Sequence, residues 1–256
     1  MNAVRRYEAI MERLLSQKEV TVAELSDRLQ VTGKTIREDL AKLEEKGLLL
    51  RVHGGAVLAQ SEQLGILPAK EPFTKHNTEK AEIAELALHY IKDGDIIALD
   101  GGSTTFEIAR KLDNRPLTVI TNDVFIIGEL ARKPDIRLVV PGGSRVRNML
   151  IGPEAAALVR TFNVRKAFLS STGVHAEYGF SIYTSDFLAF KQALIESARE
   201  RYIVADRHKF GTVALRTFAK LTEVDAILTD GGLDRGTAET FRRAGVRVEY
   251  EHEARE

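Results

Sequence analysis

The sequence contains no cysteine, and this absence excludes two classes of site. Without thiols the chain can form neither disulfides nor thiolate metal sites, and a reducing compartment suits it. No stretch approaches the ~18 consecutive apolar residues of a membrane-spanning helix, and the N-terminus lacks the apolar core of a signal peptide. These absences predict a soluble cytoplasmic protein that does not bind membranes.

An excess of charge of either sign is also absent. The 256 residues include 37 lysines and arginines against 37 aspartates and glutamates. Residues 1–57 hold ten basic and nine acidic residues, a net charge of +1. Because proteins that bind nucleic acids usually present a basic surface, any DNA binding here must depend on a few locally placed cations.

Common enzyme motifs are absent as well. The chain has no G-x-x-x-x-G-K-[ST] phosphate loop, no histidine cluster with metal-ligand spacing and no convincing nucleophile–base pair. The six histidines are scattered, which indicates surface or capping roles. We therefore expect a protein that is not an enzyme and that holds no cofactor and no metal.

Residues 31–47 have the pattern of a short amphipathic helix. A hydroxyl residue that can cap a helix opens this stretch, and a glycine closes it. Ile36, Leu40 and Leu43 fall at i, i+4 and i+7, which predicts one apolar stripe for a core. The opposite face is polar at its N-terminal end, as in a helix that enters a groove of DNA.

The elements around this helix complete a winged helix-turn-helix. Residues 4–17 read as an amphipathic helix, and Thr21 with Glu24 predicts a capping box that opens a second helix. After the third helix, two short strands flank the turn at 54–55. Three helices followed by a hairpin predict a DNA-binding domain over residues 1–57.

The candidate DNA contacts fall into two groups. The N-terminal residues of a recognition helix face the bases, and here they are Lys34, Thr35, Arg37 and Glu38. Arg37 could pair bidentately with guanine, a contact that discriminates by ~1–3 kcal/mol. The residues expected at phosphates are Arg5, Arg6, Arg51 and His53. The alternative is a solvated, ion-paired helix face, which we favour for outer residues such as Asp39 and Glu44.

A second, larger domain follows a linker. Residues 58–76 contain two prolines and no clear period, which indicates the linker. From 77 to 256 apolar strands alternate with helices, so we expect a doubly wound, largely parallel α/β domain covered on both faces. The strands are predicted over 95–100, 117–121, 136–140, 166–170, 202–206, 224–229 and 246–250. The helices are predicted over 79–91, 103–112, 124–132, 153–162, 186–199 and 237–244.

Residues 99–105, L-D-G-G-S-T-T, could bind an anion. A strand ends here, two glycines turn the chain, and three hydroxyl residues open a helix. The free N–H groups and the dipole of a helix N-terminus favour an anion. The alternative is ordinary capping by Ser103 or Thr104.

Other polar loops follow the strands at 121–123, 142–145, 171–173 and 206–211, and a parallel sheet places them on the same rim. Lys209 could supply a cation for a phosphate, while Asp100, Asn122 and Asp206 could hydrogen-bond hydroxyls. A cation together with several hydrogen-bonding side chains suits a phosphorylated sugar or polyol. The alternative is that these residues are polar because loop tips are polar in any protein. Lys80 and Lys191, on predicted helices, read as ordinary surface lysines.

Taken together, these motifs resemble the DeoR-type transcriptional regulators. The N-terminal match is carried by Thr32, Thr35-Ile36-Arg37, Asp39-Leu40, Leu43-Glu44, Gly47-Leu48, Arg51 and His53-Gly54-Gly55-Ala56. The C-terminal match is carried by Lys80, Ile83-Ala84, Asp100, Gly102-Ser103-Thr104-Thr105, Thr121-Asn122, Gly142-Gly143, Gly152-Pro153-Glu154-Ala155, Asp206 and Lys209-Phe210-Gly211. The order and spacing of these motifs cover nearly the whole chain.

The resemblance implies a bacterial repressor of a sugar or polyol catabolic operon that a phosphorylated sugar releases from DNA. It also implies an effector domain similar in fold to ribose-5-phosphate isomerase and acyl-CoA transferases. By matching position, the effector pocket would be lined by Asp100, Gly102, Ser103, Thr104, Thr105, Asn122 and Lys209. Either Arg145 or Arg147 would take the place of the family's arginine, and we assign Arg145 to the pocket.

One departure from the family concerns possible enzyme chemistry. Where the family commonly has Gly-x-Asp-Gly, residues 170–173 read Ser-Ser-Thr-Gly, and Thr172 cannot act as a carboxylate base. The main alternative, an isomerase-like enzyme with an accessory DNA-binding domain, is therefore disfavoured. An activator, or a sensor of an unphosphorylated ligand, remains open. Because operators are usually read by symmetric oligomers, we expect a homo-oligomer, either a dimer or a tetramer.

Overall fold

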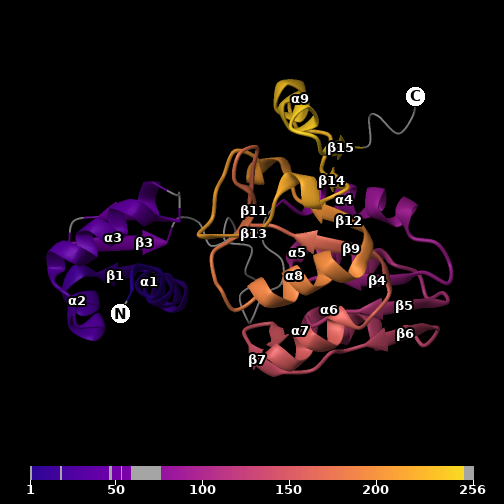
Figure 1. The fold of residues 1–256 in the computed structure, drawn as a ribbon, viewed down its shortest axis with the longest axis horizontal. Coiled ribbons are helices and arrows are strands. Elements are labelled where there is room, and N and C mark those ends of the chain that lie inside the picture. The colour runs from indigo at the N-terminus through magenta and orange to yellow at the C-terminus, as the bar shows by residue number, and fades with distance from the viewer. Residues whose placement is uncertain (1, 18, 46–47, 53, 59–75, 251–256) are drawn as a thin grey trace.

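A computed structural model describes residues 2–17, 19–45, 48–52, 54–58 and 76–250 (Figure 1). The small N-terminal domain contains helices α1 (Ala3–Gln17), α2 (Val22–Leu29) and α3 (Gly33–Glu45). Its strands are β1 (Glu19–Thr21), β2 (Leu49–Val52) and β3 (Gly55–Leu58), which form an antiparallel sheet in the order β1-β3-β2. The predicted winged helix-turn-helix is confirmed, with β1 as a third strand beside the hairpin.

The predicted apolar stripe of α3 forms the centre of this domain. Ile36, Leu40 and Leu43 are buried against apolar residues of α1 and α2. Thr32 caps the helix, since its Oγ1 accepts a hydrogen bond from Thr35 N at 3.2 Å. The burial of this stripe turns the opposite face of α3 toward solvent.

Two details of the predicted capping and surface are wrong. Thr21 Oγ1 accepts from Glu24 N at 3.1 Å, but the Glu24 side chain pairs with Arg13 at 2.7 Å. The capping box is therefore only half formed. Asp39 is buried, although we expected it on the solvated face, because Arg6 of α1 donates to both of its oxygens at 2.7 and 3.0 Å.

The larger domain is built on a seven-stranded parallel sheet in the order β15-β14-β12-β9-β4-β5-β6. All seven predicted strands are present, as β4 (Ile96–Leu99), β5 (Leu117–Ile120), β6 (Ile136–Val139), β9 (Val164–Ser170), β12 (Ala198–Val204), β14 (Ala226–Leu228) and β15 (Arg247–Glu249). The predicted helices correspond to α4 (Asn77–Tyr90), α5 (Ser103–Lys111), α6 (Val124–Leu130), α7 (Pro153–Arg160), α8 (Leu188–Ser197) and α9 (Arg235–Arg243). The predicted linker falls mainly outside the described residues.

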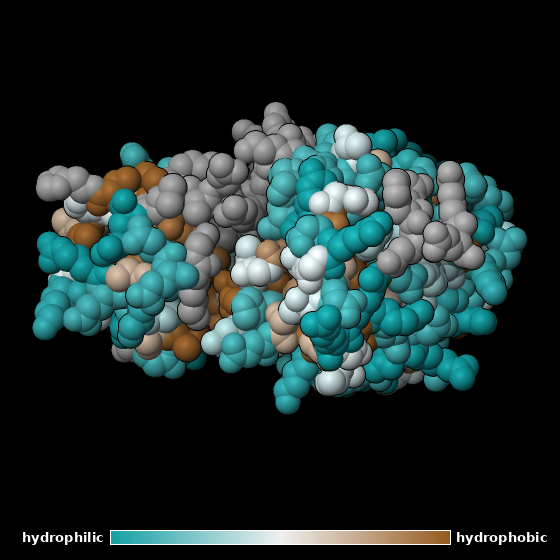
Figure 2. Space-filling model, turned by 90° about the horizontal axis from the view of Figure 1, so that it is seen from above, coloured by the Kyte–Doolittle hydropathy of each residue, from teal (hydrophilic) through white to brown (hydrophobic). Residues whose placement is uncertain are grey.

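Helices cover both faces of the sheet, as the alternation predicts. One apolar cluster joins buried residues of α4, α5 and α6 to the sheet, and a second joins α7, α8 and α9. The outer surface seen in Figure 2 is largely hydrophilic, with apolar residues in smaller patches, several of them on the N-terminal domain. Within the described ranges, no helix has the length and apolar character needed to cross a membrane.

The sequence analysis missed the short antiparallel strands. A hairpin of β7 (Ser144–Val146) and β8 (Met149–Ile151) follows β6. A separate three-stranded sheet contains β10 (Gly173–His175), β11 (Gly179–Ile182) and β13 (Arg216–Ala219), and two single-turn 3-10 helices are η1 (Arg207–Lys209) and η2 (Leu221–Glu223). Strands of three or four residues carry too few positions for an alternating pattern to be distinguished from a loop.

The loop after β11 joins the two domains. Tyr183 from this loop is buried in the same apolar cluster as Tyr7, Ile10 and Met11 of α1. A hydrogen bond from Ser185 Oγ to Glu8 of α1 adds a polar contact. The helix-turn-helix core is thus completed by a side chain from the α/β domain.

Candidate DNA interface and ligand site

The N-terminal end of α3 presents the residues expected to contact bases. Lys34, Arg37 and Glu38 are exposed, and Thr35 is half-buried beside the cap. Among the described residues, neither Lys34 nor Arg37 has an ion-pair partner. Neither cation would therefore have to leave an ion-pair partner among the described residues in order to meet DNA.

The residues expected to contact phosphates differ in their exposure and in their ion pairs. Arg5 is exposed on α1, while Arg6 is committed to Asp39 as described above. Arg51 pairs with Glu44, whose carboxylate accepts from Arg51 Nε at 2.6 Å. His53 lies outside the described residues. Arg6 thus links α1 to α3, and Arg51 would have to leave Glu44 to reach a phosphate.

The candidate ligand site lies where the chain reverses direction along the sheet. From β4 the chain continues outward through β5 and β6, and it then returns to β9 on the other side of β4. Ligands of open α/β sheets bind at such a switch point, outside the carboxyl ends of the strands. Asp100 follows β4 and Ser170 ends β9, so both residues stand at this point.

A buried ion pair holds the switch point together. Asp100 Oδ2 accepts hydrogen bonds from Ser170 N and Ser170 Oγ, both at 3.1 Å, and from Lys191 Nζ. Lys191 Nζ also donates to Ser170 O at 2.7 Å and lies 4.8 Å from the centre of the Phe218 ring. Lys191 is only 3% exposed, so our prediction of a surface lysine is wrong. Helix periodicity placed it on α8 but could not reveal a buried partner 91 positions away.

The two glycines after Asp100 allow a close approach of neighbouring segments. A Cβ on Gly101 would lie 1.8 Å from Met149 Sδ, and a Cβ on Gly102 would lie 2.6 Å from Ser170 Cβ. Side chains at these positions would push β8 and β9 away. The tight fit brings the N-terminus of α5 directly to the switch point.

The N-terminus of α5 has the properties of an anion site. Gly102 is the N-cap residue, so no side chain caps the helix, and the alternative of ordinary capping by Ser103 or Thr104 is wrong. The first helical hydrogen bond runs from Phe106 N to Gly102 O at 2.9 Å. The preceding N–H groups have no acceptor within the helix, which is where helices attract anions.

The hydroxyl residues here differ in burial. Ser103 is half-buried, whereas Thr104 and Thr105 are buried. Thr105 Oγ1 donates to Gly102 O at 2.9 Å, which fixes the first turn. Ser103 is therefore the most accessible hydroxyl of the three.

Two buried oxygens beside this helix lack a hydrogen-bond donor. Within the part of the chain that the structure describes, Asp100 Oδ1 and Asn122 Oδ1 are buried and unpartnered. Asn122 Nδ2 is satisfied by Leu150 O at 2.9 Å, so the amide has a fixed orientation. An unsatisfied buried acceptor costs about 1–3 kcal/mol. Donors from a ligand, such as sugar hydroxyls, would remove that cost.

Asp123 is a titratable group that the sequence analysis placed only in a polar loop. Burial, with a smaller contribution from nearby Asp100, raises the pKa of Asp123 to about 6. The backbone N–H groups of Ile126 and Phe125 and the side chain of Asn148 oppose this rise. Its Oδ1 caps α6 by accepting from Phe125 N at 2.8 Å. Asn148 Nδ2 donates to its other oxygen.

The β7–β8 hairpin covers this edge of the site. Leu150 N donates to Asn122 O at 2.7 Å, and Val124 N donates to Asn148 O at 2.8 Å. Arg147, at φ 59°, turns its guanidinium onto Tyr183, 5.3 Å from the ring centre, and donates to the hydroxyl. Arg145 on β7 is exposed. Arg147 therefore faces the domain contact, and Arg145 remains our prediction for the effector.

Lys209 lies one strand further along the rim, in η1 after β12. Lys209 is half-buried, while Asp206 is buried and accepts from His208 N at 3.1 Å, which caps the 3-10 turn. Gly211 N donates to Val174 O at 2.8 Å, so the loop after η1 is anchored on β10. The structure thus puts Lys209 on the expected rim.

A winged helix-turn-helix joined to an α/β domain with a ligand site at its switch point defines a ligand-responsive, DNA-binding transcriptional regulator. Residues 6–62 match the DeoR-like helix-turn-helix domain, and residues 75–231 match the DeoR C terminal sensor domain. The chain belongs to the DeoR family of transcriptional regulators.

Relatives that align over most of this chain are also named as transcriptional regulators or repressors. The HTH-type transcriptional regulator YulB of Bacillus subtilis (strain 168) is 34% identical, over 97% of this chain and 96% of its own. Transcriptional repressor AccR of Agrobacterium fabrum is 33% identical, over 89% of each chain. These names identify regulators and not enzymes.

The structure also aligns with ribose 5-phosphate isomerase A from Methanocaldococcus jannaschii, at 19% identity and a TM-score of 0.40. That alignment covers 53% of this chain and 55% of the isomerase. Likeness at this level carries no information about activity.

The raised pKa of Asp123 predicts a pH dependence of stability. Between about pH 4 and pH 6 the folded protein holds a proton that the unfolded chain has lost. The stabilisation from this proton is complete below about pH 4 and is lost as the pH rises through 6. Asp123→Asn, which retains a capping oxygen, should remove about 3 kcal/mol of this pH dependence.

Urea unfolding at several pH values between 4.5 and 7.5 measures the effect. Relative to the wild type, the Asp123→Asn variant should become more stable as the pH rises. Asp113→Asn, at an exposed position, is the matched control and should show a constant difference. A difference between Asp123→Asn and wild type that is the same at every pH would contradict the assignment.

Proposed function

We propose that this protein is a repressor of a sugar or polyol catabolic operon and that a phosphorylated sugar releases it from operator DNA. One observation supports the part of this proposal that concerns the effector. An uncapped helix N-terminus lies beside two buried acceptor oxygens that have no donor among the described residues. The first feature suits a phosphate, and the second suits the hydroxyls of a sugar or polyol.

In this proposal several of the predicted pocket residues have a defined role. The N–H groups at the start of α5, with the Ser103 hydroxyl, bind the phosphate, and Lys209 or Arg145 contributes a cation. Asp100 and Asn122 accept hydrogen bonds from the hydroxyls through their free oxygens. The β7–β8 hairpin, which is hydrogen-bonded to Asn122, closes over the ligand.

Repression requires specific binding to an operator. The exposed Lys34 and Arg37 at the start of α3 supply base or phosphate contacts, and Arg5 supplies a phosphate contact. Since residues 1–57 carry a net charge of only +1, one domain offers little bulk attraction to DNA. A homo-oligomer, dimer or tetramer, would supply the missing affinity by binding two half-sites at once. The repressor AccR, a relative, supports repression over activation.

An isomerase-like enzyme is the weaker alternative. Thr172 stands where the resemblance would place a carboxylate, and Lys191 is neutralised by the buried Asp100. The relatives are named as regulators. The site therefore suits binding without turnover.

Replacement of Arg37 tests the recognition helix. Arg37→Ala should weaken specific operator binding by about 5- to 150-fold, which corresponds to the ~1–3 kcal/mol of one bidentate base contact. Binding of the effector should be unchanged. Footprinting on DNA upstream of the neighbouring genes measures the effect, with Arg132→Ala on the surface of the α/β domain as the control. An undiminished footprint would remove Arg37 from the interface.

Replacement of the hydroxyls at α5 tests the anion site. Thermal-shift screening with sugars and their phosphates identifies the effector, because a ligand at ~100 times its Kd stabilises by ~2.7 kcal/mol. The double variant Ser103→Ala with Thr104→Ala should still bind operator but lose the response to the phosphorylated ligand.

Thr161→Ala, at an exposed position after α7, is the control for this variant and should respond fully. A normal response in the double variant would place the phosphate elsewhere. If only unphosphorylated sugars stabilise the protein, the proposal that the effector carries a phosphate is wrong.

A further inference from the structure

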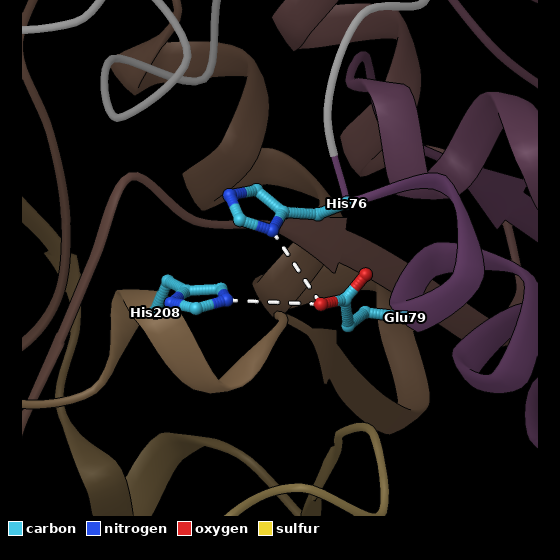
Figure 3. Close-up of side chains that lie close together, drawn as sticks. All are labelled: His76, Glu79 and His208. Atoms are coloured by element: carbon cyan, nitrogen blue, oxygen red, sulfur yellow. Dashed lines mark ion pairs between the residues drawn. The ribbon is translucent and has the colours of Figure 1, made fainter.

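Two histidines and a glutamate meet at the rim of the α/β domain, outside the effector site. His76 is the N-cap residue of α4, Glu79 lies in the first turn of that helix, and His208 lies in η1. Figure 3 shows both imidazoles and the carboxylate pointing toward one another. The sequence analysis found no metal site, because the two histidines are far apart in the sequence and no spacing rule connects them.

The distances within this cluster fit metal coordination better than direct hydrogen bonds. His76 Nδ1 lies 3.5 Å and His208 Nε2 lies 3.7 Å from Glu79 Oε1. Nitrogen–oxygen hydrogen bonds are usually 2.7–3.2 Å long. Ligands of a tetrahedral Zn²⁺ at about 2.0–2.1 Å are separated by about 3.3 Å. The three donor atoms all lie within 4.8 Å of one another, so small movements would place them around one ion.

The cluster is accessible from solvent. The side chains of His76 and His208 are 34% and 44% exposed, so an ion can reach them from solvent. The imidazole rings lie side by side, with their centres 4.1 Å apart and their planes tilted by 35°, so both histidines reach the same point.

Arg207 is the group that opposes a metal here. Its Nη2 donates to Glu79 Oε1 at 2.9 Å, while its Nη1 is held by Asp230. An ionised carboxylate offers about four acceptor positions, so Glu79 can accept from Arg207 and bind a metal together. The charge of the guanidinium lowers the affinity of the site but does not block it.

We propose that His76, Glu79 and His208 bind a divalent transition metal of the Zn²⁺ type, with water at the fourth position. Two imidazoles and one carboxylate around an open position form a common ligand set for this metal. Mg²⁺ and Ca²⁺ prefer oxygen ligands and do not bind.

A metal at this site would connect two segments of the α/β domain that are far apart in the sequence. His76 directly follows residues 59–75, which connect the DNA-binding domain to the α/β domain in the sequence. His208 adjoins Lys209 in η1, the candidate cation for the effector. A bound metal would fasten the start of α4 to the loop after β12, and so fix the point where the linker enters the α/β domain.

Zn²⁺ binding to the full chain, prepared without a histidine tag, tests this inference. A titration in competition with a chromogenic chelator should show one tight ion per chain. His76→Ala and His208→Ala should each weaken this binding by about 100-fold or more, since even loss of an outer-shell partner costs 10- to 100-fold. Substitution with Co²⁺ should give the visible absorption of a tetrahedral site in the wild type alone.

The control is His89→Ala, which removes an exposed histidine from the other end of α4. This variant should bind Zn²⁺ as the wild type does, and thermal unfolding without metal checks that all three variants fold. Absence of a tight ion in the wild type would overturn the site. Undiminished binding in both His76→Ala and His208→Ala would overturn it equally.

Discussion

The buried ion pair between Lys191 and Asp100 is the interaction on which the ligand site depends. It joins the carboxyl ends of β4 and β9 to helix α8 on one face of the sheet. Helix α5, on the other face, begins three residues after Asp100. Loss of one partner from such a pair leaves an uncompensated buried charge and costs several kcal/mol. The pair occupies one oxygen of Asp100, and the other has no donor within the part of the chain that the structure describes. The same contact that orders the candidate site therefore leaves an acceptor for a ligand.

A short chain of contacts leads from this site to the DNA-binding domain. The β7–β8 hairpin is hydrogen-bonded to Asn122 at the site, and its Arg147 contacts Tyr183. Tyr183 in turn completes the core of the helix-turn-helix against α1. In our account, an effector that moves the hairpin changes the packing of Tyr183, and thereby the placement of α3 relative to DNA. Linkage requires only that the two conformations differ in affinity for both ligands.

Much of this fold could be predicted, because its main elements carry long and regular patterns. The seven apolar strands, the helices between them and the stripe of Ile36, Leu40 and Leu43 are all local signals. The errors concern partners that are distant in sequence. Asp39 and Lys191 are charged residues of types that usually lie on the surface, and their burial becomes favourable because folding brings Arg6 and Asp100 close to them.

In the proposed mechanism, one ligand controls binding to one DNA site through the coupling free energy between the two domains. The direct test is the operator affinity of the full-length protein, measured with and without the sugar phosphate that stabilises it. We predict that the ligand weakens operator binding by about 5- to 150-fold, which corresponds to ~1–3 kcal/mol, and that operator weakens ligand binding by the same factor. A stabilising sugar phosphate that leaves operator affinity unchanged would contradict the account.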